Sequence, residues 1–449
     1  MERISNSYCQ KITQNKYFPF FLAGFLMLLH FLSGYPGGMT PDSMDQFNQA
    51  LVFNFSSHHP PLMAILWSGF NFIYKGPQLI LLFQLGLIWG RALFLYYGDQ
   101  SNRYRWIYFL IPFVPNILAQ STMVWKDIGF GCAFFFVFSG CVYYLYQTKK
   151  ANFIVSSIFI LIGFYGLAAK FQAQYVAPAL FFFIVTISTN RNLLFKLICT
   201  IVISVLTIFS SSYIIDKFSV NNNSWQLRQF FDIAAIVVDL DDDSVLPDYV
   251  KDYKGYNFKT LKNKFTHKIV DNLIFPEDRV YISTHDPEKL KQLNDNFFDL
   301  ITAHPFLYLK HRSLNFSMQM IATYDSKTYS KIHDKRALDE LEVHYFNNNF
   351  LQETVFKFLS LYPPIFRANL ISLILVIIYA YESYKVKNYT NTEKQVLTYV
   401  VIIGLIFSIT NFLTCMASVY RYYYFIRLLT FFTIPIYLKL RLINKAKIT

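Results

Sequence analysis

Long apolar runs separated by short polar segments dominate this sequence. The runs occupy residues 17–35, 77–97, 106–122, 124–146, 152–169, 171–188, 193–215, 364–382, 396–414 and 421–439. Because a helix of about 20 apolar residues crosses a bilayer, the pattern predicts an all-α polytopic membrane protein with about ten transmembrane helices.

One further apolar segment, residues 61–74, is too short to be assigned by its length alone. If it does not cross, every second loop is basic and both termini lie in the cytoplasm. If it crosses, several basic loops move outside and the termini lie on opposite sides. We therefore predict an interfacial helix on the outer surface, with Trp67 and Tyr74 near the lipid headgroups. The basic residues that decide this are Arg3, Lys11, Lys16, Arg103, Arg105, Lys149, Lys150, Arg191, Lys196, Lys385, Lys387, Lys394, Lys439, Arg441, Lys445 and Lys447.

This topology predicts three parts. Residues 1–215 form an N-terminal transmembrane module whose first outer loop is 36–76, and residues 361–449 form a C-terminal transmembrane module. Between them, residues 216–360 form an extracytoplasmic soluble insert, which we expect to be mainly α-helical. The expected location is the inner (plasma) membrane, crossed many times.

Composition agrees with a membrane protein and narrows its partners. Hydrophobic residues make up 54% of the chain and charged residues only 15%, with a mean hydropathy of +0.30. The net charge of +13 does not indicate nucleic-acid binding, because most lysines and arginines outside the insert lie in short loops, where they set topology. The cysteines, Cys9, Cys132, Cys141, Cys199 and Cys415, all lie outside the insert, so we expect no disulfide framework there.

The first outer loop carries the densest group of polar residues, including Asp42, Asp45, His58 and His59. Pro41 suits the first turn of a helix over residues 42–53, with both carboxylates near one face. One interpretation is a general base for an acceptor hydroxyl, or a metal ligand. The other is a pair of first-turn acids favoured by the helix dipole. For the adjacent histidines, hydrogen bonding to substrate or backbone is expected rather than chelation of one ion.

Two other outer turns carry polar residues. Lys126 and Asp127 open a spanning helix, where they form either an ion pair with one another or a site for a phosphate and a metal or sugar hydroxyl. Lys170, Gln172 and Gln174 occupy a tight turn, and they indicate either a polar cavity or, for the lysine, a side chain that snorkels to the membrane surface.

Near the C-terminus, Arg421 and Tyr422 open the last predicted span on the outer side. The arginine departs from the charge rule that the other loops follow. A buried phosphate explains it, as does a snorkelling side chain in an aromatic belt. In the insert, residues 304–312 either touch a lipid headgroup or, as we expect, form a solvated surface. The acidic run 239–243 lacks the glycine and glutamate of an EF-hand, and we expect a solvated loop there.

Together these segments resemble the GT-C superfamily of membrane glycosyltransferases, which includes protein O-mannosyltransferases, aminoarabinose transferases and glycosyltransferase-39-like families. The resemblance covers Thr40–Gly98 and extends to Asp127 and to the pair Arg421 and Tyr422. One departure is the position of the soluble part, which here precedes the last three predicted spans, whereas many members carry theirs after the last helix.

The resemblance implies an enzyme that transfers a sugar from a polyprenyl-phosphate donor to an acceptor hydroxyl on a glycan or lipid at the outer face. It implies a role in cell-envelope glycan or lipopolysaccharide modification. Asp42 or Asp45 would be the base, Asp127 the second acid, and Lys126, Lys170 and Arg421 the phosphate ligands. No cofactor is certain, and a divalent cation is left open. The alternatives are a transporter or flippase of a lipid-linked or anionic solute, and an O-antigen polymerase or ligase.

Overall fold

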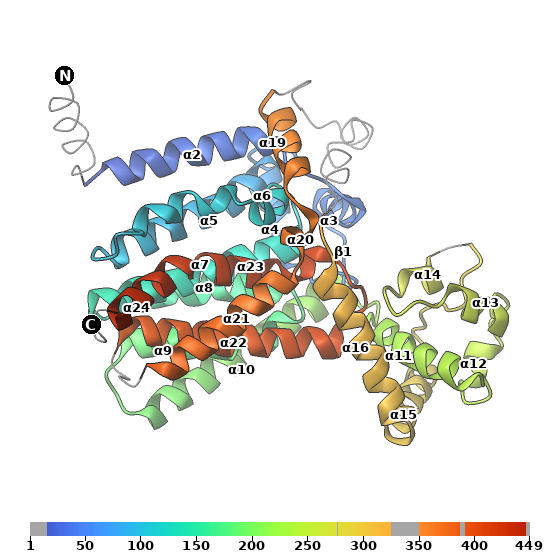
Figure 1. The fold of residues 1–449 in the computed structure, drawn as a ribbon. Coiled ribbons are helices and arrows are strands. Elements are labelled where there is room, and N and C mark those ends of the chain that lie inside the picture. Colours follow the sequence, from blue (N-terminus) through green and yellow to red (C-terminus); the bar gives the residue numbers. More distant parts are fainter. Residues whose placement is uncertain (1–15, 276, 325–349, 387–390, 446–449) are drawn as a thin grey trace.

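The computed structural model describes residues 16–275, 277–324, 350–386 and 391–445 (Figure 1). These residues form an all-α fold, as predicted; the strands among them are the short parallel pair β1 (Phe55–Ser56) and β2 (Ser219–Val220). The basic residues Arg3, Lys11, Lys387 and Lys447, the cysteine Cys9 and residues 325–349 of the insert lie outside the described residues.

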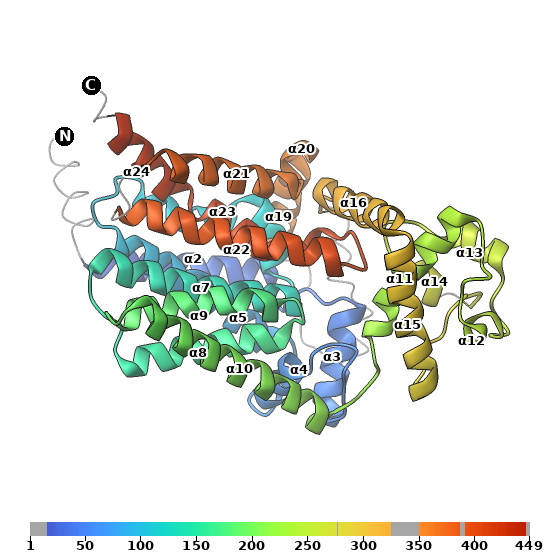
Figure 2. The same cartoon turned by 90° about the horizontal axis from the view of Figure 1, so that it is seen from below.

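The apolar helices lie side by side in a bundle (Figures 1 and 2). Four helices of the described residues are long and apolar enough to cross a membrane: α5 (Gln78–Gly98), α7 (Lys126–Gln147), α10 (Leu193–Phe218) and α22 (Thr392–Thr414). The shorter members of the bundle are α2 (Phe18–Gly34), α8 (Phe153–Ala169), α9 (Ala173–Ser188) and α21 (Leu370–Lys385).

Two predicted spans are broken. Residues 106–122 form η1 (Arg105–Phe109), η2 (Ile111–Phe113) and α6 (Pro115–Ser121), and residues 421–439 form η3 (Tyr420–Tyr423), α23 (Tyr424–Phe431) and α24 (Ile434–Lys445). Pro112, Pro115 and Pro435 lie at the breaks, where a proline has no N–H for the helix ladder and clashes with the preceding turn. The prediction of single helices over these two segments is therefore wrong.

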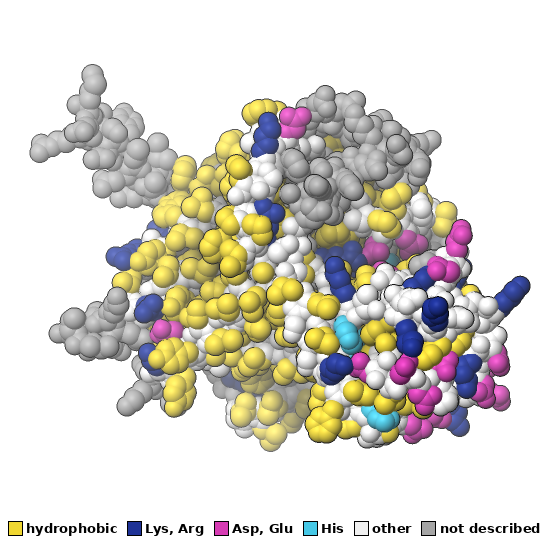
Figure 3. Space-filling model, turned by 45° about the vertical axis from the view of Figure 1, so that its right-hand side comes forward, with side chains coloured by type: hydrophobic (Ala, Val, Ile, Leu, Met, Phe, Trp, Pro, Cys, Tyr) yellow, Lys and Arg dark blue, Asp and Glu magenta, His cyan; other side chains and the backbone are white. Residues whose placement is uncertain are grey.

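Burial separates the centre of the bundle from its surface. The apolar window of α7 is 78% buried and that of α10 only 17% buried. The exposed side chains of α10 include Leu206 and Phe209. A continuous apolar surface of this kind is typical of contact with another apolar phase, as expected for lipid-facing helices. Figure 3 shows hydrophobic side chains over the bundle and charged side chains gathered on the insert.

The insert projects from one end of the bundle (Figures 1 and 2). It has its own core, which includes Phe230, Leu273 and Phe297. It is mainly α-helical, as predicted. Its helices are α11 (Trp225–Leu240), α12 (Asp248–Lys251), α13 (Phe258–Lys264), α14 (Asp271–Ile274), α15 (Pro287–Ala303) and α16 (Pro305–Ile321), and α19 (Phe350–Leu361) and α20 (Pro364–Arg367) lead back to the bundle.

Residues 304–312 do not form the expected solvated surface throughout. His311 and Arg312 on α16 are fully buried. Arg312 pairs with the buried Asp232 of α11 and donates a hydrogen bond to the Cys415 carbonyl at 2.7 Å. Because a buried charge must be compensated, this pair joins the insert to the loop that precedes the last two bundle helices.

The short apolar segment forms α4 (Leu62–Asn71). Trp67 is fully buried against Phe47, and its Nε1 donates a hydrogen bond to the Gly76 carbonyl at 2.8 Å. The expectation that Trp67 lies near the headgroups is wrong, because its indole packs between α4 and α3 (Pro41–Val52). Tyr74, by contrast, is 42% exposed.

Candidate functional site

Helix α3 begins at Pro41, as its sequence predicts, and its first turn is fastened to the segment before α7. Trp125 Nε1 donates a hydrogen bond to Thr40 Oγ1 at 2.6 Å, and Ser43 Oγ donates to the Val124 carbonyl at 2.6 Å. These contacts hold the start of α3 beside the start of α7. Asp42 and Asp127, which lie in the first turns of these two helices, are thereby brought to the same end of the bundle.

The two carboxylates share one arginine. Arg421 donates through Nη2 to Asp42, and its Nε lies 3.5 Å from Asp127 Oδ2. Lys170 donates to the other oxygen of Asp127, and both of these side chains are almost fully buried. The structure therefore brings together residues from α3, α7, the α8–α9 turn and η3. The snorkelling interpretations of Lys170 and Arg421 are wrong, because both side chains turn inward to carboxylates.

Lys126 turns away from its neighbour Asp127. Its Nζ contacts His59 Nδ1, and His59 Nε2 lies 4.0 Å from Asp42 Oδ1. The mutual ion pair that the sequence left open is replaced by these longer-range contacts.

The histidines of the first loop are neutral at neutral pH. Burial, followed by the nearby Lys126 ammonium, lowers the pKa of His58 and of His59 below the usual histidine value. A neutral imidazole can accept one hydrogen bond and donate another, so both rings suit hydrogen bonding to a hydroxyl-bearing ligand.

Asp45 lies outside the cluster of ion pairs. It is exposed, and its Oδ2 accepts a hydrogen bond from Gln49 Nε2 at 2.7 Å, one turn along the same helix. The two first-loop acids that the sequence did not separate therefore have different surroundings: Asp42 faces Arg421, and Asp45 is bound within α3.

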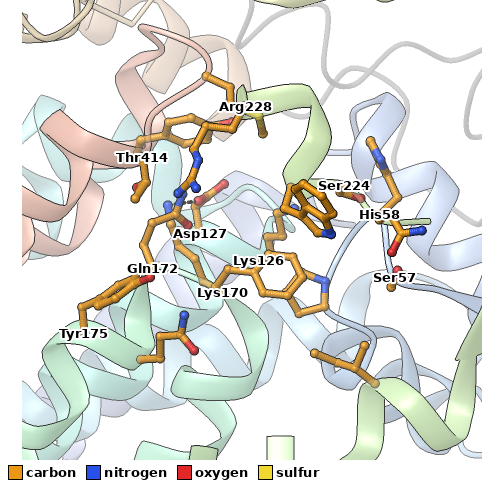
Figure 4. Close-up of a pocket in the computed structure, with 18 of the residues that line it drawn as sticks. Ser57, His58, Lys126, Asp127, Lys170, Gln172, Tyr175, Ser224, Arg228 and Thr414 are labelled. Atoms are coloured by element: carbon orange, nitrogen blue, oxygen red, sulfur yellow. Dashed lines mark hydrogen bonds and ion pairs between the residues drawn. The ribbon is translucent and has the colours of Figure 1, made fainter. Parts of the chain in front are cut away.

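A cavity of about 450 Å³ opens beside this cluster (Figure 4). Its lining includes most of the predicted binding residues, namely His58, Lys126, Asp127, Lys170, Gln172, Gln174 and Tyr422. Asp42, His59 and Arg421 adjoin this lining: His59 contacts Lys126, and Arg421 contacts Asp127 and Asp42.

Sequence reasoning missed the contribution of the insert to this cavity. Trp225 and Arg228 line it from α11 (Figure 4 labels the arginine), and Tyr175 and Thr414 add to it from the bundle. Trp225 and Arg228 are three apart, a spacing that places two side chains on one face of a helix. That spacing was the available signal, but only the fold shows that this face meets the bundle.

The residues that line the cavity include three cations, Lys126, Lys170 and Arg228, and one carboxylate, Asp127. Next to the lining, Arg421 pairs with Asp42, and Asp271 acts electrostatically on both of them. The Nε of Arg228 is buried without a hydrogen-bond partner among the described residues. An excess of fixed cations around a cavity favours an anionic ligand. Within the described residues, no group of three or more His, Cys, Asp or Glu side chains is arranged to hold a metal ion.

Comparisons of the chain with protein-family models, with curated proteins and with solved structures found no match.

Proposed function

We propose that this chain is a membrane glycosyltransferase of the GT-C type. It transfers a sugar from a polyprenyl-phosphate donor to an acceptor hydroxyl at the outer membrane face, in cell-envelope glycan or lipopolysaccharide modification. The observation that carries the proposal is the convergence of Asp42, Asp127, Lys126, Lys170 and Arg421 beside one cavity at one end of an apolar helix bundle.

The proposal includes ten membrane passages, with the broken segments 105–121 and 420–445 as two of them. Helix α2 begins and α24 ends at the end of the bundle opposite the insert (Figure 1). Contacts at that end join α2 to α5, and α24 to α5 and α22: Tyr97 donates to the Lys16 carbonyl at 2.6 Å, and Lys439 Nζ lies 2.6 Å from Asp99 and 2.7 Å from Glu393.

The distribution of positive charge indicates which end of the bundle faces the cytoplasm. The basic residues in the loops and adjoining helix ends at this end of the bundle include Lys16, Arg103, Arg105, Lys149, Lys150, Arg191, Lys196, Lys385, Lys394, Lys439 and Arg441. Because short basic loops stay in the cytoplasm, this end is assigned to the cytoplasm and the cavity to the outer face of the inner membrane. Both termini are placed in the cytoplasm with it.

The donor's lipid tail has a route out of the cavity. A narrow crevice of about 80 Å³ continues from it between α8 and α10, sharing Pro60, Phe171 and Ile215 with the cavity lining. Its lining includes Ile208 and Ile215 of α10, the helix whose apolar side chains are mostly exposed, and we assign the lipid tail to this side. A polyprenyl chain requires such a lateral apolar exit, and a soluble nucleotide-sugar does not.

The phosphate is assigned to the cations that line the cavity, Lys126, Lys170 and Arg228. Fixed cations in a partly dry site stabilise the negative charge that develops on the departing phosphate without reorganisation. The leaving group is already a phosphate, so no nucleotide-binding domain is required.

Asp42 is assigned as the general base. Its side chain is 33% exposed, whereas that of Asp127 is 2% exposed, so an acceptor hydroxyl reaches Asp42 more readily. When the donor phosphate binds, Arg421 exchanges part of its contact with Asp42 for the phosphate. Asp42 then accepts the hydroxyl proton, the acceptor oxygen bonds to the anomeric carbon, and the bond from that carbon to the phosphate oxygen breaks with inversion. Asp127 positions Lys170 and Arg421.

Sugar transfer in reconstituted vesicles tests the proposal. Purified protein is supplied with radiolabelled polyprenyl-phosphate hexoses and an envelope glycolipid extract, and labelled product is counted. Transfer is expected for the wild type and for Asp295→Asn, an exposed change on α15, and it is expected to be lost in Asp42→Asn and Arg421→Ala. Movement of the labelled lipid across the vesicle without conversion would instead support a transporter, and addition of whole repeat units would support a polymerase.

A further inference from the structure

The cavity described above is the first of three that adjoin one another. A second, of about 290 Å³, shares His58 and Ser224 with it. A third, of about 560 Å³, shares Tyr281, Ile282 and Ser283 with the second. We call the second and third cavities the insert track, because the second meets the first at His58 and Ser224 and the third lies on the surface of the insert.

One buried glutamine fixes the wall of this track. Gln226 Oε1 accepts hydrogen bonds from the Tyr281 hydroxyl and from the Thr284 N–H, both at 2.8 Å, and its Nε2 donates to the Thr284 carbonyl at 3.1 Å. Gln226 lies between Trp225 and Arg228 on α11, the residues that line the first cavity. The same helix therefore positions both the cavity and the track.

The chemistry of the lining changes along the track. The second cavity carries hydrogen-bond donors, Arg279 and His285, beside the ring of Phe275. The third carries the rings of Tyr249 and Tyr253 and the carboxylates of Asp248, Asp252, Asp286 and Glu288, with Lys289 as its cation. Tyr281 also lines it, but its ring is buried and stacked on Phe230. An excess of carboxylates repels phosphate, so the donor headgroup is confined to the first cavity.

The change in lining residues along the insert track suits the chemistry of sugars. A sugar hydroxyl both donates and accepts hydrogen bonds, so it is served by the donors of the second cavity and by the acceptor-only carboxylates of the third. The tyrosine rings offer apolar faces with polar edges, which suit the faces of a pyranose ring. A volume of about 560 Å³ is within the ordinary range of ligand sites.

We propose that the insert track binds a neutral oligosaccharide acceptor, with its reacting hydroxyl near Asp42 and His58 and its distal sugars between Tyr249 and Tyr253. This proposal rests on the proposed transferase function for the identity of the reacting end. It gives the insert a role in choosing the acceptor, and it predicts that a single sugar is a poor acceptor.

Two binding measurements on the purified full chain test this. Maltotetraose, cellotetraose and mannotetraose are the oligosaccharide probes, and undecaprenyl phosphate is the donor-lipid probe. At least one tetrasaccharide is expected to bind, about tenfold or more weakly in Tyr253→Ala and in Asp252→Asn, with unchanged affinity in the matched control Asp295→Asn. The wild type and the Tyr253→Ala, Asp252→Asn and Asp295→Asn variants are expected to bind undecaprenyl phosphate with equal affinity. Lys126→Ala is expected to bind it poorly.

The outcomes separate the two proposals. Failure of all three tetrasaccharides to bind, or equal binding by the Tyr253 and Asp252 variants, would overturn the insert track. Tetrasaccharide binding that depends on Tyr253 and Asp252, together with no binding of undecaprenyl phosphate by the wild type, would support the track and contradict the donor assignment of the first cavity.

Discussion

Arg421 holds the candidate site together at the level of single residues. It contacts Asp42 and Asp127, and its bond to Asp42 spans 379 positions of sequence. The sequence indicated that each of these residues lies at the outer end, because loop charge and helix starts are local signals. It did not indicate which side chains pair, because pairing depends on how α3, α7 and η3 pack.

Sequence patterns likewise did not predict which polar side chains are buried. Lys170 was interpreted either as part of a polar cavity or as a surface lysine, and only the adjacent Asp127 carboxylate explains why it is buried. Arg228 was not singled out, because an arginine in a soluble domain is ordinarily solvated. Both assignments required the three-dimensional arrangement.

The difference between the two first-loop acids gives a prediction. Asp42→Asn is expected to lower kcat about 100-fold or more, because it removes the proton acceptor. Asp45→Asn is expected to change kcat by less than about threefold, since exposed substitutions have small effects. Steady-state transfer kinetics of the two isosteric variants decide the question, and a larger loss in Asp45→Asn would exchange the two roles.

His311 gives a prediction about pH. Burial, then Arg312 and His267, lowers the pKa of His311 from 6.5 to about 2. Below pH 6.5 the unfolded chain binds a proton at this histidine and the native protein does not. The free energy of unfolding therefore falls as the pH falls. Between pH 6.5 and 5 this one group contributes a loss of about 2 kcal/mol. Asp232, whose carboxylate lies 3.5 Å from His311 and whose pKa burial raises to about 6, contributes a smaller change of the opposite sign.

The measurement for His311 is the Tm of the purified chain at these two pH values. His311→Gln is expected to show a smaller drop in Tm on acidification than the wild type. His285→Gln, at an exposed histidine, serves as the control and is expected to keep the wild-type drop. An unchanged drop in His311→Gln would show that other groups dominate the acid response.

At the scale of elements, hydrophobic periodicity and proline positions predicted helices correctly where the two were considered together. The start of α3 at Pro41 and the short α4 were predicted correctly. The segments 106–122 and 421–439 were taken as single helices because their hydropathy is high, although Pro112, Pro115 and Pro435 interrupt them. Hydropathy reports burial in an apolar phase, and it does not report whether the backbone ladder is continuous.

The attachment of the 281–284 segment to α11 gives an element-scale prediction. Gln226→Leu removes all three hydrogen bonds to this segment and leaves the buried Tyr281 hydroxyl without that partner. The expected cost is about 1–3 kcal/mol, with faster hydrogen exchange at the Thr284 amide. Asp295→Leu, at an exposed position of α15 outside the cavity linings, is expected to leave that exchange rate unchanged, and equal rates in both variants would contradict the role of Gln226.

At the scale of the whole molecule, the docking of the insert completes the end of the bundle that carries the cavity. Residue Ile269 forms an antiparallel bridge with Ala417, and Ser418 N–H donates to the Lys268 carbonyl at 2.7 Å. The sequence predicted a separate insert between transmembrane modules, and it gave no sign that the insert would share a cavity with them. The insert and the bundle dock through residues far apart in the sequence, and such contacts leave no pattern in a local stretch of residues.

Sidedness is the whole-molecule prediction. In a cysteine-free background, Asn54→Cys and Asp295→Cys are expected to react with a membrane-impermeant maleimide in intact cells. Lys149→Cys is expected to react only after permeabilisation. All three positions are exposed in the fold, so their reactivity reports the side of the membrane. Reaction of Asn54→Cys and Lys149→Cys from the same side would contradict the proposed ten passages.

The central claim is that the ion pair between Asp42 and Arg421 performs chemistry and does not only hold α3 to η3. The charge swap Asp42→Arg with Arg421→Asp, compared with each single change, tests it most directly. We predict that the swap recovers most of the Tm lost by the single variants, because opposite charges again face one another, while sugar transfer stays at least about 100-fold below wild type. Recovery of transfer together with Tm would show that the pair is structural and would contradict the account.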